Sequence, residues 1–405
     1  MNAPHSPTLL SGVQMAPRDP ILGLTEAYNA DKNPKKVNLG VGVYTGDDGK
    51  VPLLECVRRA EQQLVAQPVA RNYLPIDGLA SYDKAVQSLV FGADSAALKE
   101  GRIVTVQTLG GTGGLRVGAD FLHRTAPAAG LWISDPSWEN HRAVFESAGF
   151  KVNAYPYYNA KTRGVDFDGM LGALKAMPPG DVVLLHACCH NPTGVDLSEA
   201  QWAGVVETMA ARGLVPFLDI AYQGFGDGLD ADGSAVRLFA QSGMPLLVAN
   251  SFSKSFSLYG ERVGSLNVVA ATSDEGARVL SQIKRLVRSN YSNPPTHGSK
   301  IVAAVLADPE LRTLWQQELG QMRDRIKSMR TLLVEKIHAR VPGANFGFIT
   351  QQRGMFSYSG LSKEQVVRMR EEFAVYAIES GRICVAALNS GNVDYSADAI
   401  AKVIA

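Results

Sequence analysis

The first clear pattern in the chain is an alternation of short apolar runs with segments whose apolar residues recur every three or four positions. The runs are rich in β-branched residues and are bounded by Gly, Pro, Asp or Asn, as buried strands are. They predict five strands, over residues 103–107, 131–134, 182–186, 214–220 and 246–250. Helical spacing fills residues 133–152 and 194–214, and this order predicts a mostly parallel sheet covered by helices on both faces.

Beyond residue 308 the pattern changes to one long helix followed by a mixed segment. Apolar residues step by three or four from Leu311 to Ile337 and form a single stripe, which Pro342 and Gly343 bring to an end. Residues 354–359, a helical pattern over 363–376 and a strand-like run over 383–387 follow. Together they predict a smaller α+β unit.

Composition argues against several classes of protein. The chain has 405 residues, of which 46% are hydrophobic and 20% charged, so it can bury the cores of two or three domains. Lys and Arg number 40 against 39 Asp and Glu, a balance that argues against nucleic-acid binding. The mean hydropathy is −0.03, and no apolar run approaches the ~20 residues that a membrane span needs.

The cysteines and the first residues bear on location. Cys188 and Cys189 are adjacent, which does not suit a disulfide framework, so the four cysteines indicate a reduced, cytoplasmic setting. Residues 1–13 have neither a basic start nor a long apolar stretch and do not resemble a secretory signal. Residues 1–16 are expected to form an N-terminal arm.

Candidate chemistry follows the predicted strands, where ligands gather in open α/β sheets. The run from Gly110 to Gly114 comes after the first strand and before a helix expected at residues 115–122. Glycine backbone at a helix start can hold a phosphate, although a tight turn explains the run equally well. The spacing matches neither GxGxxG nor a Walker P-loop, so a nucleotide enzyme gains little support.

A zinc site is one interpretation of His186, Cys188, Cys189 and His190, which lie at the end of another predicted strand. Two points count against it. Adjacent cysteines on a strand end point to opposite faces, and structural zinc ligands are usually spaced C-x₂₋₄-C. Residues 191–194 indicate a turn and a helix start, and we expect no metal.

An acid, an amine and an arginine complete the set. Asp219 ends an apolar strand, where it either caps a helix or holds a cation such as a protonated ring nitrogen. Lys254 follows the strand at 246–250; although most lysines are simply solvated, a buried amine near other cations can form a Schiff base. Arg262 offers a planar fork suited to phosphate. An anion cradle, a carboxylate, an amine and this arginine are the groups that pyridoxal 5′-phosphate (PLP) requires.

Longer motifs identify a family. The stretches VNLGVGVY, YLPIDG, GGTGG, SDPSWENH, HNPTG, DIAYQGF, SFSKSFSLYGERVG, RSNYSNPP, GMFSYSGL and SGRICVA occur in this order from about residue 17 onward. With them the chain resembles the fold-type I, class I aminotransferases, and most closely the bacterial aromatic-amino-acid and aspartate enzymes. The resemblance implies a large PLP-binding α/β domain at residues 47–318 with a mostly parallel seven-stranded sheet, and a small α+β domain formed by residues 17–46 together with 319–405.

The resemblance also implies roles around the cofactor. Lys254 matches the lysine that binds the PLP aldehyde and transfers the substrate proton, and Asp219 matches the acid that pairs with the pyridinium nitrogen. Among the other matches, Tyr222 and Asn191 bind the ring oxygen, Trp138 stacks on the ring, Gly111, Thr112, Ser251 and Arg262 bind the phosphate, and Tyr73 reaches the phosphate from the neighbouring subunit. His141 and His186 match groups that surround Asp219.

Substrate contacts follow from the same resemblance. Arg382 matches the clamp on the α-carboxylate, and Arg288 matches the group that reaches a distal carboxylate from the neighbouring subunit. Gly42 matches a backbone contact near the substrate, and Trp138 and Asn191 also border it. Residues contributed across subunits imply a homodimer with shared active sites.

Two departures from the family pattern stand beside these matches. Gly110 occupies a position where many members have Ser, which puts one side-chain contact to the phosphate in question. Thr45 and Gly46 follow Tyr44, where aspartate-specific relatives often carry a basic residue. The second departure points to a looser fit for small diacids.

The implied activity is transamination of tyrosine, phenylalanine and aspartate with 2-oxoglutarate, giving 2-oxo acids and glutamate. The first alternative is an aspartate-specific aminotransferase. A different PLP reaction such as a β-decarboxylation is another, although the pairing of Arg288 with Arg382 favours diacid transamination. Two further alternatives come from other classes of protein. The chain lacks the GxGxxG motif expected of a nicotinamide oxidoreductase, and a non-catalytic regulator would have no need of Lys254.

Overall fold

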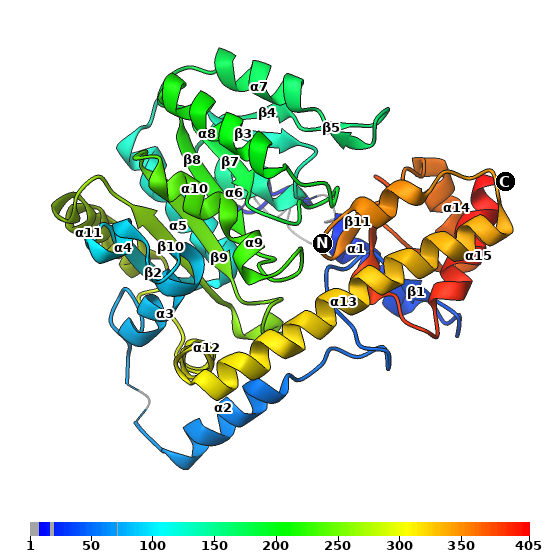
Figure 1. The fold of residues 1–405 in the computed structure, drawn as a ribbon, viewed down its shortest axis with the longest axis horizontal. Coiled ribbons are helices and arrows are strands. Elements are labelled where there is room, and N and C mark those ends of the chain that lie inside the picture. Colours follow the sequence, from blue (N-terminus) through cyan, green and yellow to red (C-terminus); the bar gives the residue numbers. More distant parts are fainter. Residues whose placement is uncertain (1–7, 17–19, 71) are drawn as a thin grey trace, which may run out of the picture.

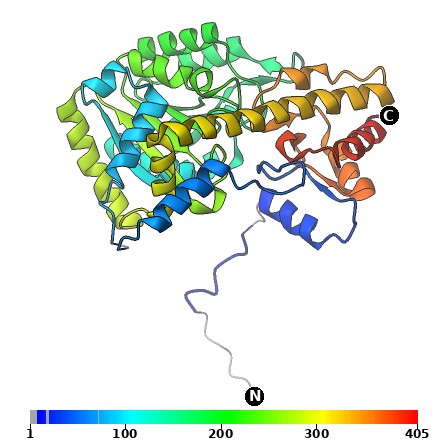
Figure 2. The same ribbon diagram turned by 60° about the horizontal axis from the view of Figure 1, so that its bottom comes forward.

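The computed structural model describes residues 8–16, 20–70 and 72–405, and of residues 20–22 only the backbone. The predicted N-terminal arm therefore lies partly outside the described residues. Its residues 8–16 are exposed (Figure 2). No helix within the described ranges is both long and apolar enough to cross a membrane.

A seven-stranded sheet forms the centre of the structure (Figure 1). In spatial order its strands are β2 (Ile103–Leu109), β10 (Val263–Val269), β9 (Leu246–Ser251), β8 (Val215–Ile220), β7 (Val182–His186), β3 (Leu131–Asp135) and β4 (Val152–Pro156). Only β10 runs antiparallel to its neighbours among these strands. The mostly parallel seven-stranded sheet is confirmed.

Helices cover both faces of this sheet. One face carries α5 (Gly110–Thr125), α6 (Glu139–Ser147) and α11 (Ser273–Asn290), and the other carries α3 (Ala80–Phe91), α7 (Phe167–Ala176), α8 (Glu199–Arg212) and α10 (Ser234–Gln241). Phe217 and Leu218 are neighbours on β8, are both fully buried and belong to separate core clusters. Because successive side chains point to opposite faces, a strand buried on both sides must be apolar throughout.

The glycine run lies inside α5 and not before it, so the helix starts five residues earlier than we expected. A side chain at Gly114 would place its Cβ 2.7 Å from the carbonyl oxygen of Ser265 on β10. At Gly118 the Cβ would lie 2.5 Å from the ring of Phe217. The glycines therefore let α5 lie directly on the sheet, and this close packing outweighs their low helix propensity.

A second, smaller region joins the two ends of the chain (Figure 1). It contains α1 (Pro20–Ala30), α14 (Lys363–Phe373) and α15 (Val393–Ile404). Two short sheets hold it together: β1 (Val37–Asn38) pairs in parallel with β12 (Val375–Tyr376), and β11 (Phe356–Tyr358) pairs antiparallel with β13 (Arg382–Cys384). The smaller α+β unit predicted from the later chain is present.

One long helix, α13 (Pro309–Arg340), extends from the central sheet region to the smaller region (Figures 1 and 2). It starts as the sequence predicted, with Pro309 in its first turn and the Asp308 carboxylate accepting hydrogen bonds from the backbone N–H of Glu310 and Leu311. Its predicted stripe from Leu311 to Ile337 is buried, except for the half-buried Met329. Arg330 is buried on the same helix.

Several boundaries differ from the sequence prediction. The helix expected over 363–376 ends at Phe373, because Ala374 adopts a left-handed φ of 52° and the chain turns into β12. The strand-like run over 383–387 becomes a 3₁₀ turn, η3 (Val385–Ala387), after Cys384. The remaining elements are α2 (Glu55–Ala66), α4 (Ala96–Lys99), β5 (Tyr158–Asn159), β6 (Gly164–Val165), α9 (Leu229–Asp232), η1 (Tyr259–Glu261), α12 (His297–Ala307) and η2 (Gly347–Gln351).

Candidate functional site

A cavity of about 450 Å³ lies at the carboxyl ends of β7, β8 and β9. The start of α5 forms one side, and Phe356 and Arg382 of the smaller region form another. Its lining includes the predicted site residues Gly42, Gly111, Thr112, Trp138, Asn191, Asp219, Tyr222, Ser251, Lys254, Arg262 and Arg382. Residues from distant parts of the sequence therefore meet at the edge of the sheet where ligands of α/β proteins bind.

Tyr73 and Arg288 are the two predicted site residues that do not line this cavity. Tyr73 lies between α2 and α3 and is 91% exposed. Arg288 lies in the last turn of α11, is exposed, and donates a hydrogen bond to the hydroxyl of Ser292. Within the single chain, neither residue contributes to the site.

Lys254 presents an unpaired amine to the cavity. Its Nζ lies 4.7 Å from the centre of the Tyr222 ring and has no hydrogen bond or ion pair with any described residue. Burial lowers the pKa of Lys254 to about 8, against the opposing effect of Asp219 and with a further lowering by Arg262. A much larger fraction of this amine is therefore neutral at physiological pH than of an ordinary lysine.

Asp219 is held by a histidine network. Its Oδ2 lies 2.9 Å from Nε2 of His141, whose Nδ1 lies 3.0 Å from the hydroxyl of Ser137. Burial raises the pKa of Asp219, but the hydrogen bond and charge of His141, with smaller contributions from His186 and Lys254, leave it below its usual value. Asp219 is thus a buried carboxylate that stays ionised and can pair with a cation.

His186 lies beside this network. Its ring centre is 4.8 Å from that of His141, and its Nε2 is buried without a hydrogen-bond partner. Burial and the neighbouring His141 lower the pKa of His186 to about 3, so the ring is neutral. Both histidines therefore lie next to Asp219, as the family resemblance implied.

Arg382 is a buried cation without an acidic partner among the described residues. Its Nη1 donates to Oδ1 of Asn191 at 3.1 Å, and its Nη2 donates to the carbonyl oxygen of Gly40 at 2.7 Å. The guanidinium carbon lies 4.4 Å from the centre of the Phe356 ring, and Nε has no partner. Because a buried charge is costly unless paired, this guanidinium is suited to bind a carboxylate ligand.

An anion cradle lies at the other end of the cavity. Arg262 has a left-handed φ of 53°, and its Nη1 donates to the hydroxyl of Ser253 at 3.3 Å and to the carbonyl oxygen of Tyr259 at 3.0 Å. A Cβ at Gly110 would lie only 2.4 Å from Nη2 of Arg262. The departure at Gly110 thus makes room for the guanidinium beside the first turn of α5, where the helix dipole also favours an anion.

Three hydroxyl-bearing or aromatic residues of the lining were not assigned a role from the sequence: Ser253, Tyr259 and Phe356. The hydroxyl of Tyr259 accepts a hydrogen bond from the backbone N–H of Tyr44 at 2.9 Å, and so connects the loop after Lys254 to the smaller region. All three lie within motifs that carried the family resemblance. The signal available in the sequence was their position. Ser253 and Tyr259 are close to Lys254, and Phe356 lies inside the GMFSYSGL stretch.

The argument that adjacent cysteines must diverge is wrong for Cys188 and Cys189. The strand β7 ends at His186, and Cys189 has a left-handed φ of 51°. The alternation of a strand therefore does not apply here. The sulfur atoms of both residues and a carboxylate oxygen of Asp232 lie within 4.8 Å of one another.

Comparisons with known proteins agree on one family. The pattern of the family described as aminotransferase class I and II matches residues 34–400. An aspartate aminotransferase of Pseudomonas aeruginosa is 58% identical over 397 residues, which cover 98% of this chain and 100% of that protein. An aromatic-amino-acid aminotransferase of Escherichia coli is 53% identical over 95% of this chain and 98% of its own length.

A solved structure gives the same result. The aromatic-amino-acid aminotransferase of Burkholderia pseudomallei, determined covalently bound to pyridoxal phosphate, is 64% identical and superposes with a TM-score of 0.97 over 98% of this chain and 100% of its own. These matches favour an aminotransferase over the nicotinamide oxidoreductase and the non-catalytic regulator. The chain is an enzyme that belongs to the class I and II aminotransferases.

Proposed function

We propose that this enzyme uses PLP to transfer the amino group of aromatic amino acids and of aspartate to 2-oxoglutarate. The observation that carries the proposal is the unpaired amine of Lys254. It shares one cavity with the ionised Asp219, the anion cradle around Arg262 and the unpaired guanidinium of Arg382. Covalent attachment, ring pairing, phosphate binding and carboxylate binding each have a residue of the required chemistry.

The hydrogen-bond donors that line the cavity fit PLP. Arg262, Ser251 and the backbone of Gly111 and Thr112 offer hydrogen-bond donors to a phosphate at the start of α5. Burial raises the pKa of Tyr222, so its hydroxyl keeps its proton and can donate to a ring oxygen. Bound there, PLP would supply an electron sink for the carbanion chemistry of transamination.

Three residues of the chain have separate roles in the proposed reaction. Arg382 holds the α-carboxylate with two parallel hydrogen bonds and so orients the Cα–H bond of the substrate. In its neutral form the amine of Lys254 can take the proton from Cα of the substrate and, as the ammonium, can give it up again. Asp219 stays ionised through His141 and would pair with a protonated ring nitrogen of the bound cofactor.

The proposal includes both aromatic amino acids and aspartate as substrates. Relatives of similar identity are named for aspartate and for aromatic amino acids, and an aspartate-specific enzyme is the alternative. The test is to measure kcat/KM with aspartate, phenylalanine and tyrosine side by side and to identify the 2-oxo acid products. Turnover of all three supports the proposal; negligible rates with both aromatic substrates leave the aspartate-specific alternative, and release of carbon dioxide would indicate decarboxylation.

A homodimer with shared active sites is part of the proposal. Tyr73 and Arg288 lie outside the cavity of their own chain and have exposed side chains. Val51, Leu53, Val65 and Val69, on and around α2, are also exposed apolar residues close to Tyr73 in the sequence. In a dimer the second subunit would bury this surface. Tyr73 and Arg288 of the first chain would then reach the cavity of that second subunit.

Mixing two impaired subunits tests this sharing. With aspartate as substrate, Lys254→Ala and Arg288→Ala homodimers should both be weak, because one lacks the amine and the other the distal guanidinium. Random reassembly should restore about a quarter of wild-type activity, since half of the dimers then hold one intact site. Mixing Lys254→Ala with Arg382→Ala is the matched control and should restore none, because those two residues line the same cavity; equal recovery in both mixtures would contradict sharing.

The lowered pKa of Lys254 predicts a pH profile for cofactor attachment. Only the neutral amine attacks an aldehyde, so the rate of PLP attachment to the apoprotein should rise about tenfold per pH unit below about pH 8 and level off above it. Stopped-flow absorbance would give the midpoint. Arg262→Gln, which removes a cation, should move the midpoint to higher pH, whereas Arg262→Lys should leave it nearly unchanged; a midpoint near 10 in the wild type would contradict the prediction.

A methyl group at Gly110 should weaken PLP binding. Gly110 has a left-handed φ of 68°, and its Cβ would collide with Nη2 of Arg262. Strain of about 1–3 kcal/mol or displacement of Arg262 should raise the dissociation constant of PLP about tenfold or more. Gly260→Ala is the control, because its Cβ would meet no atom within 4 Å; equal affinities of the two variants would contradict the assignment.

Two finer assignments complete the proposal. We place the small domain at residues 17–46 and 319–405 and the large domain at residues 47–318. The pairing of β1 with β12 supports this division; residues 17–19 are outside the described ones.

We also place the enzyme in the cytoplasm, because its four cysteines are free and buried, as suits a reducing compartment.

A further inference from the structure

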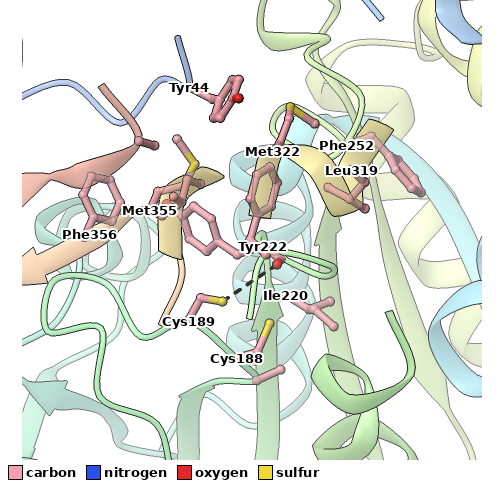
Figure 3. Close-up of a cluster of buried hydrophobic side chains, with 14 of the residues drawn as sticks. Tyr44, Cys188, Cys189, Ile220, Tyr222, Phe252, Leu319, Met322, Met355 and Phe356 are labelled. Carbon is pink, nitrogen blue, oxygen red and sulfur yellow. Dashed lines mark hydrogen bonds between the residues drawn. The ribbon is translucent and has the colours of Figure 1, made fainter. Parts of the chain in front are cut away.

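A compact group of sulfur and oxygen atoms lies behind the wall of the active-site cavity. The thiols of Cys188 and Cys189 and a carboxylate oxygen of Asp232 lie within 4.8 Å of one another. The three residues are buried, with exposures of 7%, 2% and 6%. Figure 3 shows the two sulfur atoms near one another, close to Tyr222.

The backbone is built so that the two thiols converge. The left-handed conformation of Cys189 turns its side chain to the same side as that of Cys188. The carboxylate of Asp196 accepts the N–H of Cys189 at 2.7 Å and that of His190 at 2.8 Å, and so fixes the turn. A non-glycine residue held in this conformation indicates a constraint that the surrounding structure maintains.

Hydrogen bonds also fix the position of the Asp232 carboxylate. Asp232 ends α9, and its two oxygens accept the N–H groups of Gly224 at 2.7 Å, Gly226 at 2.9 Å and Asp227 at 2.9 Å. Oδ2 accepts the bonds from Gly224 and Gly226, and Oδ1 accepts only the bond from Asp227, so Oδ1 keeps a lone pair with which Asp232 can bind a metal. Such outer contacts are typical of residues that hold a metal.

The thiol and carboxylate cluster can be reached from the surface and has a positive charge nearby. Cys188 and Asp232 line a cavity of about 340 Å³ that also includes the exposed residues Ser198 and Glu199, and this cavity leads to the surface. On the other side, the buried Arg330 donates to the carbonyl oxygen of Phe356 at 3.0 Å and to that of Gly354, against which Cys189 packs. Arg330 has no carboxylate partner among the described residues, so a thiolate at Cys189 would give it a nearby negative charge.

We propose that Cys188, Cys189 and Asp232 form a binding site for one thiophilic divalent cation, of which Zn²⁺ and Cd²⁺ are the type. Two sulfurs and one oxygen are ligands that these ions accept, and a water from the cavity can complete a tetrahedron. Binding replaces two S–H bonds by two metal–sulfur bonds and releases two protons, with no change in oxidation state. None of its ligands lines the catalytic cavity, so the site does not depend on the PLP assignment; its nearest link to that cavity is Sγ of Cys189, which lies 3.9 Å from the carbonyl oxygen of Tyr222.

Cadmium titration of the holoenzyme tests the site. The ultraviolet thiolate-to-cadmium charge-transfer band should saturate at about one equivalent per chain, and about two protons should be released per cadmium ion bound. Zn²⁺ should compete for the same site. A wild-type protein that shows neither a saturable band nor proton release would overturn the proposal without the use of any variant.

Substitutions then locate the ligands. Cys188→Ala and Cys189→Ala should each weaken cadmium binding at least tenfold, and Asp232→Asn should weaken it by about 10–100-fold while both thiols remain. Cys56→Ala is the matched control, since Cys56 is also buried but lies on α2, away from the cluster. A band that survives in both cysteine variants, or that is lost with Cys56, would assign cadmium to another thiol and overturn the proposal.

Discussion

Replacement of Lys254 by alanine is expected to lower kcat for transamination by at least about 10⁴-fold, the upper range for removal of a general acid–base group. The reason is that this amine has two roles in the proposed function: it attaches the cofactor and it moves the substrate proton. Among the described residues no other lysine lines the cavity, so none of them can substitute for it. The visible band of the attached cofactor should shift to that of free PLP.

The controls for this variant separate chemistry from folding. Lys84→Ala, an exposed lysine on α3, should keep full activity and an unchanged absorbance spectrum. Small primary amines added to Lys254→Ala should restore part of the proton transfer, because the substitution leaves space in a cavity of about 450 Å³. Borohydride reduction and peptide mapping of the wild type should label Lys254. A label on another lysine, or near-normal turnover by the variant, would refute the proposed function.

Arg382→Ala should lower kcat/KM by about 10²–10³-fold for every amino acid substrate. Loss of one partner of a buried charge pair costs about 2–5 kcal/mol, and the α-carboxylate that Arg382 binds is common to aspartate, phenylalanine and tyrosine. The variant should also free Asn191, whose Oδ1 accepts a hydrogen bond from Nη1. Steady-state kinetics with the three substrates provides the measurement.

Comparison with the distal arginine makes this test specific. Arg288→Ala should reduce kcat/KM for aspartate while leaving phenylalanine largely unaffected, since only a diacid presents a second carboxylate. Arg382→Lys keeps the charge but not the planar fork and should lie between the wild type and Arg382→Ala. If Arg382→Ala impaired aspartate alone, the assignment of the two arginines would have to be exchanged.

The sequence predicted β2, β3, β7, β8 and β9, because each is a short run rich in apolar residues, but it did not reveal β4 or, next to β2, the antiparallel strand β10. That strand carries Ser265 and Asn267 in a fully buried position, where the Asn267 amide donates to the hydroxyl of Ser265 and to the carbonyl oxygen of Val248, and its oxygen accepts from Thr105. A polar pair satisfied by its own hydrogen bond and by bonds to the two neighbouring strands has no signature in a hydrophobic pattern.

The candidate site divides in the same way. Asp219 and Lys254 were accessible from the residues alone, because strand ends converge at one edge of a parallel sheet. Arg382 and Gly42 come from the smaller region, and only the family resemblance placed them. The convergence of Cys188 and Cys189 depends on a single left-handed residue after the strand, which the spacing of the two cysteines does not encode.

The long helix α13 has a consequence for engineering this enzyme. Near its start, Nε1 of Trp315 donates to the carbonyl oxygen of Ser255, the residue after Lys254, and further along Arg330 holds the carbonyl of Phe356, which packs on Arg382. The length of α13 thus sets the distance between the amine of Lys254 and the guanidinium of Arg382. A single inserted residue between Trp315 and Arg330 would turn Arg330 by about 100° and advance it by about 1.5 Å, so changes of length that surface loops tolerate have no place in this segment.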